Sequence, residues 1–154
     1  DSLGVANYLV EIGGELRGKG RNAKQQPWHV GIEQPQLVQA QATQVVVPLD
    51  NRALATSGDY RNFHSDESGR RLSHIIDPQS EQPINHNLAS VSVVADNTMR
   101  ADGLATGLFV LGEERAMALA KQHNLAIFLI VKTQDGFTTR MSPAFQQLLA
   151  TQSR

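Results

Sequence analysis

Short apolar runs interrupted by glycine and proline make up the first third of the chain. Residues 8–12 form an apolar run typical of a strand, and residues 28–33 alternate apolar and polar side chains with the two-residue period of a half-buried strand. Gly13 and Gly14 interrupt the first run, and residues 15–19 continue it as a second extended piece after a tight bend. This region therefore predicts a sheet meander.

Farther along, the pattern indicates a hairpin and then a long polar stretch. Residues 45–47 and 54–56 predict two strands joined around Asp50 and Asn51, which are turn-forming residues. Residues 61–87 are polar apart from an apolar island at 72–76, and they predict a loop, a short strand and a second loop. Loops of this length in a compact domain are typically functional or disordered.

The last third changes from the period of a strand to that of a helix. Leu104, Leu108 and Leu111 lie four and seven residues apart and predict a helix over 97–111, which Asp96 or Asn97 can cap and Gly112 can end. The other predicted elements are a strand at 91–95, a helix at 113–123, a buried strand at 125–131 and a short helix opened by Pro143. The sum is an α+β fold with a mostly antiparallel sheet and packed helices.

Composition and charge exclude several classes of protein. The 154 residues are 40% hydrophobic and 19% charged, the balance of one ordinary globular domain. Without cysteine, a disulfide framework, a thiolate zinc site and a cysteine nucleophile are all ruled out. Fourteen basic against fifteen acidic residues leave no basic field for nucleic acid or anionic lipid. No apolar run approaches the roughly 20 residues that span a bilayer, so we expect no nucleic acid partner and no membrane insertion.

The helix predicted at 97–111 carries the most informative polar residues. Asp102 and Thr106 are four apart, so their oxygens project from one face. Small residues surround this face, and two of them are glycines, each costing a helix roughly 1 kcal/mol relative to alanine. Close approach of a ligand or of a neighbouring strand would offset that cost. Carboxylate and hydroxyl oxygens suit Mg²⁺; the alternative is a helix packed closely on a sheet with Asp102 solvated.

Two other segments could carry chemistry. The turn that follows residues 54–56 offers Thr56, Ser57 and Gly58 with successive backbone N–H groups that can cradle an anion, although ordinary turns have the same composition. His74 lies three residues before Asp77 at a strand-to-loop junction, which makes it the best general-base candidate among the histidines. The alternative is a histidine that only bonds its own turn. The remaining histidines have no metal-ligand spacing: His29, His64, His86 and His123.

Four motifs in order resemble the ApbE family, the FAD:protein FMN transferases formerly named thiamine biosynthesis lipoproteins. They are LVEIGGELR at 9–17, ATSGDYRNF at 55–63, SHIIDP at 73–78 and ADGLAT at 101–106. The resemblance runs from the first strand to about Ser142. It implies the C-terminal part of the ApbE-like, T-fold-like architecture, with residues 1–154 as a single structural unit. Family members carry an N-terminal half with the lipid-anchor signal, residues for the adenine end of FAD and a backbone metal ligand.

The resemblance also implies a reaction. FAD, bound with Mg²⁺, is split at its pyrophosphate, and FMN passes to a Thr or Ser hydroxyl of a client protein with release of AMP. Typical clients are flavoprotein subunits of membrane redox complexes, and the expected location is the periplasm, with the parent protein lipid-anchored to the inner membrane. Asp102 and Thr106 would be the metal ligands, in agreement with the grouping by spacing.

The same resemblance assigns the other site residues. His74 would lie beside the reacting phosphates and accept the proton of the client hydroxyl, Ile76 would contact the flavin, and Ser57 and Gly58 would help shape the flavin pocket. Two alternatives to the transferase stay open: an Mg²⁺-dependent FAD pyrophosphatase that gives FMN and AMP, and a non-catalytic flavin-binding protein.

This chain departs from the family pattern at two places. Some relatives have an aspartate at the position of Ala105, which would be a third metal ligand. After Asp77-Pro78 the family usually shows Thr-Gly-Arg-Pro, whereas this chain has Ser80-Glu81-Gln82-Pro83. Loss of the glycine and arginine predicts an altered turn.

Overall fold

The computed structural model describes residues 3–33, 43–58, 63–65 and 71–151. Within these residues the elements are β1 (Tyr8–Ile12), β2 (Glu15–Lys19), β3 (Trp28–Glu33), β4 (Thr43–Leu49), β5 (Ala53–Gly58), β6 (Phe63–Ser65), β7 (Arg71–Ser73), β8 (Ile76–Asp77), β9 (Gln82–Pro83), β10 (Leu88–Ala95), α1 (Thr98–Leu111), α2 (Glu113–Gln122), β11 (Ala126–Thr133), β12 (Gly136–Met141) and α3 (Pro143–Ala150).

One antiparallel sheet organises the structure. Six strands pair in the order β1-β2-β5-β10-β11-β12, and every pairing among them is antiparallel. Strands β10 and β11 each have a neighbouring strand on both sides and are buried along nearly their whole length, which agrees with their runs of β-branched and leucine side chains. The expected α+β class with a mostly antiparallel sheet is therefore confirmed.

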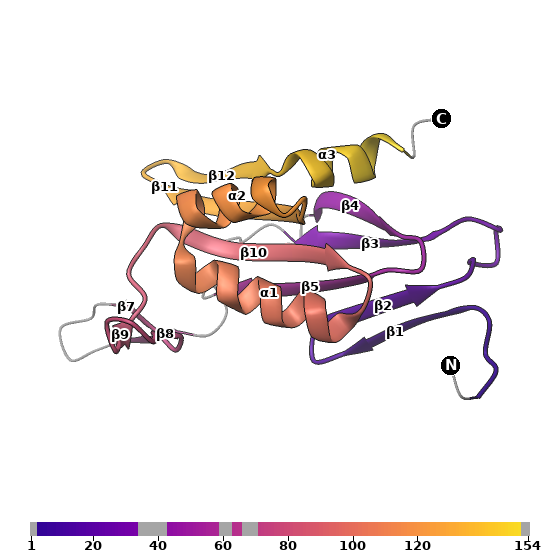
Figure 1. Ribbon diagram of the computed structural model, residues 1–154, viewed down its shortest axis with the longest axis horizontal. Helices are drawn as coiled ribbons and strands as arrows, with labels where there is room; N and C mark the ends of the chain where they lie inside the picture. The colour runs from indigo at the N-terminus through magenta and orange to yellow at the C-terminus, as the bar shows by residue number, and fades with distance from the viewer. Residues whose placement is uncertain (1–2, 34–42, 59–62, 66–70, 152–154) are drawn as a thin grey trace.

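Helices and a two-stranded ribbon cover the two faces of this sheet. Helices α1 and α2 lie over one face, as Figure 1 shows, and enclose a core that includes Phe109 and Ile127. The ribbon β3-β4 and helix α3 close the other face, where Phe128 of β11 packs on Phe145 of α3 with ring centroids 5.5 Å apart. In the described part of the chain, no helix is long and apolar enough to cross a membrane.

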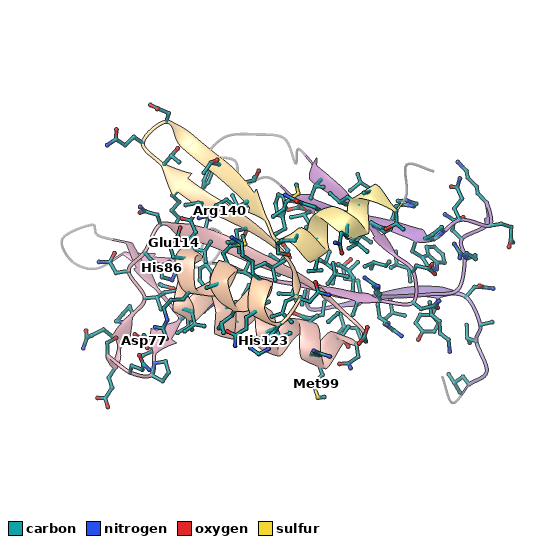
Figure 2. The ribbon with its side chains drawn as sticks, turned by 45° about the horizontal axis from the view of Figure 1, so that its top comes forward. Asp77, His86, Met99, Glu114, His123 and Arg140 are labelled. Atoms are coloured by element: carbon teal, nitrogen blue, oxygen red, sulfur yellow. The ribbon has the colours of Figure 1, made fainter. Side chains whose placement is uncertain are left out.

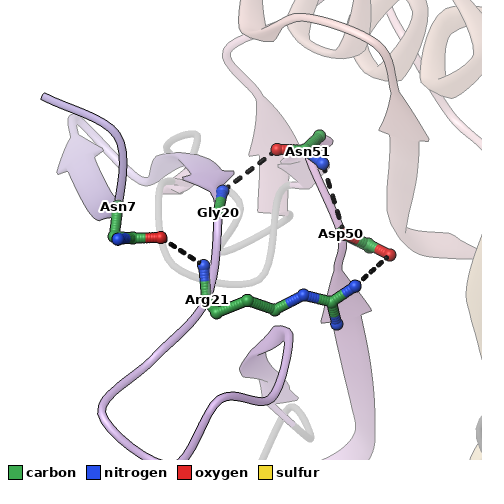
Figure 3. A network of polar contacts seen from close by, with 5 residues as sticks. All are labelled: Asn7, Gly20, Arg21, Asp50 and Asn51. Carbon is green, nitrogen blue, oxygen red and sulfur yellow. Dashed lines mark hydrogen bonds and ion pairs between the residues drawn. The ribbon is translucent and has the colours of Figure 1, made fainter. Parts of the chain in front are cut away.

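The predicted hairpin between residues 45–47 and 54–56 is wrong. Strand β4 pairs with β3, whereas β5 pairs with β2 and β10. The turn forms, with Asn51 in the left-handed region at φ 54°, but its polar groups bond to the end of β2 instead of across a hairpin. The backbone N–H of Gly20 donates to Asn51 Oδ1 at 3.0 Å, and Arg21 pairs with Asp50 at 3.4 Å (Figure 3). The turn thus leads from the ribbon into the main sheet.

Two other regions also differ from the sequence prediction. The apolar island at 72–76 forms two short strands, β7 and β8, separated by a bend at His74. Strand β12 was not predicted, because its side chains are mostly polar and it occupies a sheet edge. Arg140 fastens β12 to the start of α2 by donating to Glu113 Oε1 and Glu114 Oε1, each at 2.6 Å (Figure 2). These hydrogen bonds to Glu113 and then Glu114 raise the pKa of Arg140 above its ordinary value.

Candidate functional site

Helix α1 is fixed at both ends by the residues that the sequence suggested. Asn97 has extended backbone and its side chain accepts a hydrogen bond from the N–H of Arg100 at 2.9 Å, which caps the first turn. Gly112 ends the helix at φ 76°. The buried face turned toward the sheet consists of Ala101, Ala105, Leu108 and Phe109.

The small residues of α1 divide into two groups with different roles. Ala101 and Ala105 are fully buried, and Ala101 packs with Ala53 and Ala55 of β5, so the alanines allow the close approach of helix to strand. Gly103 and Gly107 are exposed, and a Cβ at either position would meet no atom of the described residues within 4 Å. The glycines are therefore not required for packing against the neighbouring strand. They leave an open surface without side chains beside Asp102 and Thr106.

Ser57 and Thr106 lie in direct contact. Side chains alternate along β5, so that Ala53, Ala55 and Ser57 point to the α1 side of the sheet. Ser57 Oγ and Thr106 Oγ1 are 2.8 Å apart and share a hydrogen bond. The structure thus joins a residue predicted to shape the flavin pocket to a predicted metal ligand.

Asp102 lies one turn before Thr106 at the edge of a groove of about 450 Å³. The groove is lined by apolar and charged residues of β1, β2 and the start of α1, namely Val10, Ile12, Glu15, Arg17, Thr98 and Met99 together with Asp102. Figure 2 shows Met99 projecting from this end of α1. The Asp102 carboxylate is exposed and makes no hydrogen bond or ion pair with any described residue. It is therefore available to a ligand.

Gly58 does not share a side of the sheet with Ser57. It lines a separate cavity of about 560 Å³ on the opposite face of β5, together with Thr56 and residues of β1 and β3. The prediction of an anion-binding turn at Thr56, Ser57 and Gly58 is wrong for these three residues, because they belong to strand β5 and pair with β10. Residues 59–61 of the predicted turn lie outside the described residues. Ser57 and Gly58 accordingly face two different spaces.

His74 and Ile76 belong to a small lobe beside the main sheet, which comprises residues 73–87 and contains the short strands β8 and β9 (Figure 1). Both are exposed, His74 at the bend after β7 and Ile76 in β8 with 51% of its surface accessible. No hydrogen bond links this lobe to Asp102 or Thr106 among the contacts of the described residues. The predicted base and the predicted metal ligands therefore lie on separate elements.

Few groups other than Asp102 and Thr106 could hold a metal ion. Within the described residues, no three histidine, aspartate or glutamate side chains gather closely enough to form a site. Two hard oxygen donors on an exposed face nevertheless fit Mg²⁺, which takes few protein ligands and completes its shell with water and phosphate oxygens.

Comparison with known proteins decides the family. The model of the ApbE family matches residues 1–129. The chain belongs to the ApbE family. It is 48% identical over 151 residues to the FAD:protein FMN transferase of Haemophilus influenzae, covering 98% of this chain and 43% of that protein. Against the FAD:protein FMN transferase of Vibrio cholerae it is 48% identical over 149 residues, covering 97% of this chain and 44% of that protein.

Solved structures of ApbE proteins share the fold. The apo form of the Pseudomonas stutzeri flavinyl transferase ApbE superposes with a TM-score of 0.82 at 48% identity, over 96% of this chain and 45% of that one. The ApbE protein of Thermotoga maritima gives a TM-score of 0.77 at 26% identity, over 92% of this chain and 44% of that one. The chain thus spans less than half the length of the ApbE relatives it matches.

The two departures from the ApbE pattern lie on helix α1 and in the turn after Asp77. Ala105 is fully buried against the sheet, so position 105 in this chain does not lie on the exposed face with Asp102. Three residues along a helix correspond to a rotation of about 300°, which is 60° the other way, so position 105 borders Asp102 on the side of α1 that faces the sheet. With alanine there, this chain offers no carboxylate at that position. The turn after Asp77 forms despite the changes: Glu81 N–H donates to Asp77 O at 2.8 Å, and Ser80 Oγ donates to Asp77 Oδ2 at 3.1 Å.

Glu81 stands where the ApbE pattern has glycine, and it adopts the left-handed conformation at φ 56°. Left-handed backbone costs a residue with a Cβ roughly 1–2 kcal/mol relative to glycine. Replacement by glycine removes this cost, but it also gives the unfolded chain more conformational freedom, which offsets part of the stabilisation. We expect Glu81→Gly to raise the free energy of unfolding by about 0.5–1 kcal/mol, measured by urea denaturation. The matched control is Gln79→Gly in the same turn, which should lower it; equal losses in both variants would contradict a strained Glu81.

Proposed function

We propose that this chain is part of an Mg²⁺-dependent transferase that moves FMN from FAD to a Thr or Ser hydroxyl of a client flavoprotein and releases AMP. The observation that carries the proposal is the contact between Ser57 and Thr106 at 2.8 Å, beside the open face of α1 that also bears Asp102. Relatives at 43–48% identity carry the name FAD:protein FMN transferase, which supports the proposed activity.

Asp102 and Thr106 would hold the Mg²⁺ ion. Asp102 supplies a negative charge that no described cation neutralises, and Thr106 supplies a hydroxyl oxygen held in place by Ser57. When bound, Mg²⁺ would neutralise pyrophosphate charge and favour departure of AMP. Gly103 and Gly107 leave room for a bulky substrate to approach the helix backbone.

The proposed transfer needs one group on the protein that accepts the proton of the client hydroxyl. The client hydroxyl oxygen forms a bond to the phosphorus of the FMN half, and the bond from that phosphorus to the bridging pyrophosphate oxygen breaks. His74 would accept the hydroxyl proton, and AMP leaves with the electron pair of the broken bond. Ile76, exposed in the same lobe, would offer an apolar contact to the flavin. Ser57 would border the flavin on the α1 side of the sheet, and Gly58 would border the separate space on the opposite face.

The client would be a flavoprotein subunit of a membrane redox complex. In keeping with the family resemblance, we place the reaction in the periplasm, with the parent protein lipid-anchored to the inner membrane. Radiolabelled palmitate incorporation and fractionation of cells that express the complete protein would test this, and a cytoplasmic, unlipidated product would exclude it.

Mass spectrometry of a client peptide tests the activity. The complete protein that contains these 154 residues is incubated with the peptide, FAD and Mg²⁺, with a second sample in excess EDTA. We expect a peptide carrying FMN and an equal amount of AMP only when Mg²⁺ is present. FMN and AMP with an unmodified peptide would indicate a pyrophosphatase, and bound FAD without AMP would indicate a flavin carrier.

The role of His74 is testable in the same assay. His74→Ala should lower the rate of transfer by about 10²- to 10⁴-fold, the usual contribution of a general base, while FAD binding persists. The fall should shrink as the pH rises, because hydroxide takes over the removal of the proton. An unchanged rate would exclude His74 as the base. His123→Ala, at an exposed histidine just after the end of α2, serves as the control.

A further inference from the structure

His86 connects the lobe that contains His74 to the helix that contains Asp102 and Thr106. It lies between β9 and β10, and its Nε2 is 2.8 Å from the carbonyl oxygen of Phe109 near the end of α1. Its ring meets the Phe109 ring edge-on, with centroids 5.4 Å apart and planes at 87°. Figure 2 shows His86 in the space between the lobe and the helices.

The close fit extends to the end of the helix. Gly112, which ends α1, lies so near that a Cβ there would come within 3.3 Å of His86 Cδ2. A carbonyl oxygen only accepts hydrogen bonds, so Nε2 must carry the proton and the neutral ring has the Nε2–H tautomer. Nδ1 is then an acceptor, and it is buried without a partner in the described structure. The ring is thus held by one directed bond and by packing.

The lobe itself is closed just before His86. Ile84 N–H donates to Ile75 O at 3.0 Å, which ties residues 75–84 into one loop. Both isoleucines pack on the core cluster that contains Phe109 and Leu108. Among the described residues, the His86–Phe109 hydrogen bond is the only one that joins residues 73–87 to α1. This hydrogen bond can therefore determine the position of the lobe along the helix.

We propose that His86 is a positioning residue that sets the placement of His74 relative to Asp102 and Thr106. The proposal rests on the function proposed above, since it needs the two groups to act on one substrate. His86 touches neither of them; it acts by fixing the end of α1 against the lobe. A shift of about 1 Å between reacting groups can cost on the order of 100-fold in rate, so a lost tether should affect turnover.

The test compares His86→Leu with His86→Gln in the complete protein. Leu fills similar space without a donor, and Gln restores an amide N–H that can reach Phe109 O. Global stability should change little in His86→Leu, because Phe109 O still accepts from Gly112 N at 3.2 Å and the unpaired Nδ1 is removed. His123→Leu, at an exposed histidine, is the matched control.

Amide hydrogen exchange and the kinetics of FMN transfer are both measured for the wild type and the variants. For His86→Leu we expect faster exchange of the Ile84 and Glu81 amides with unchanged protection in β10 and β11. We also expect kcat to fall about 10- to 100-fold at an unchanged Mg²⁺ requirement, with recovery in His86→Gln. Unchanged lobe exchange would overturn the proposal, as would loss of protection throughout the protein without rescue by Gln. If the wild type transfers no FMN, the proposed function fails, and exchange still decides whether His86 holds the lobe.

Discussion

Asp102→Ala should abolish Mg²⁺-dependent transfer of FMN, with a fall in rate of about 100-fold or more. The carboxylate is the charged member of the pair with Thr106, and several kilocalories per mole of charge stabilisation correspond to two or more powers of ten in rate. Its side chain is exposed and unpaired among the described residues, so the fold should tolerate the change. The measurement is AMP release and peptide flavinylation as a function of Mg²⁺ concentration.

Melting temperature and Mg²⁺ dependence together distinguish the loss of a metal ligand from damage to the fold. Asp102→Ala should keep the wild-type melting temperature while its Mg²⁺ dependence disappears, and Asp102→Asn should respond in the same way because the amide lacks the charge. Asp135→Ala, at an exposed aspartate in the turn between β11 and β12, is the control and should keep full activity. Wild-type rates and Mg²⁺ affinity in Asp102→Ala would refute the assignment.

Ser142→Ala should lower the stability of the fold substantially. The buried hydroxyl donates to Leu125 O at 2.6 Å and accepts from Ile127 N at 3.0 Å and from Phe145 N at 3.2 Å. It therefore caps α3 and also closes the start of β11. Removal leaves buried backbone groups unpaired, and we expect the free energy of unfolding to fall by about 2–4 kcal/mol, measured by urea denaturation.

Ser90→Ala provides a matched control for that prediction. Ser90 is as buried as Ser142, with 1% of its surface accessible, yet its Oγ has no hydrogen-bond partner in the described structure. Loss of an unpaired buried hydroxyl should be neutral or stabilising. Similar destabilisation of the two variants would mean that burial alone, and not the three hydrogen bonds of Ser142, determines the cost.

Local patterns along the chain were enough to predict helix α1 and one part of the site. The extent of α1 followed from its cap at Asn97 and its end at Gly112, because each depends on bonds within a few residues. Helical spacing alone also put Asp102 and Thr106 on one exposed face. The family resemblance was equally available from the sequence, and the match over residues 1–129 confirms it.

Which distant segments come into contact could be seen only in the folded chain. The turn at Asp50 and Asn51 was correctly placed, but the partner of β5 depended on side chains of β2 and β10, far away in the sequence. Likewise, no local pattern could show that Ser57 bonds Thr106 across 49 residues, or that His86 reaches Phe109. The physical reason is that periodicity and caps are local, whereas strand pairing and packing are chosen by the total burial that the whole chain achieves.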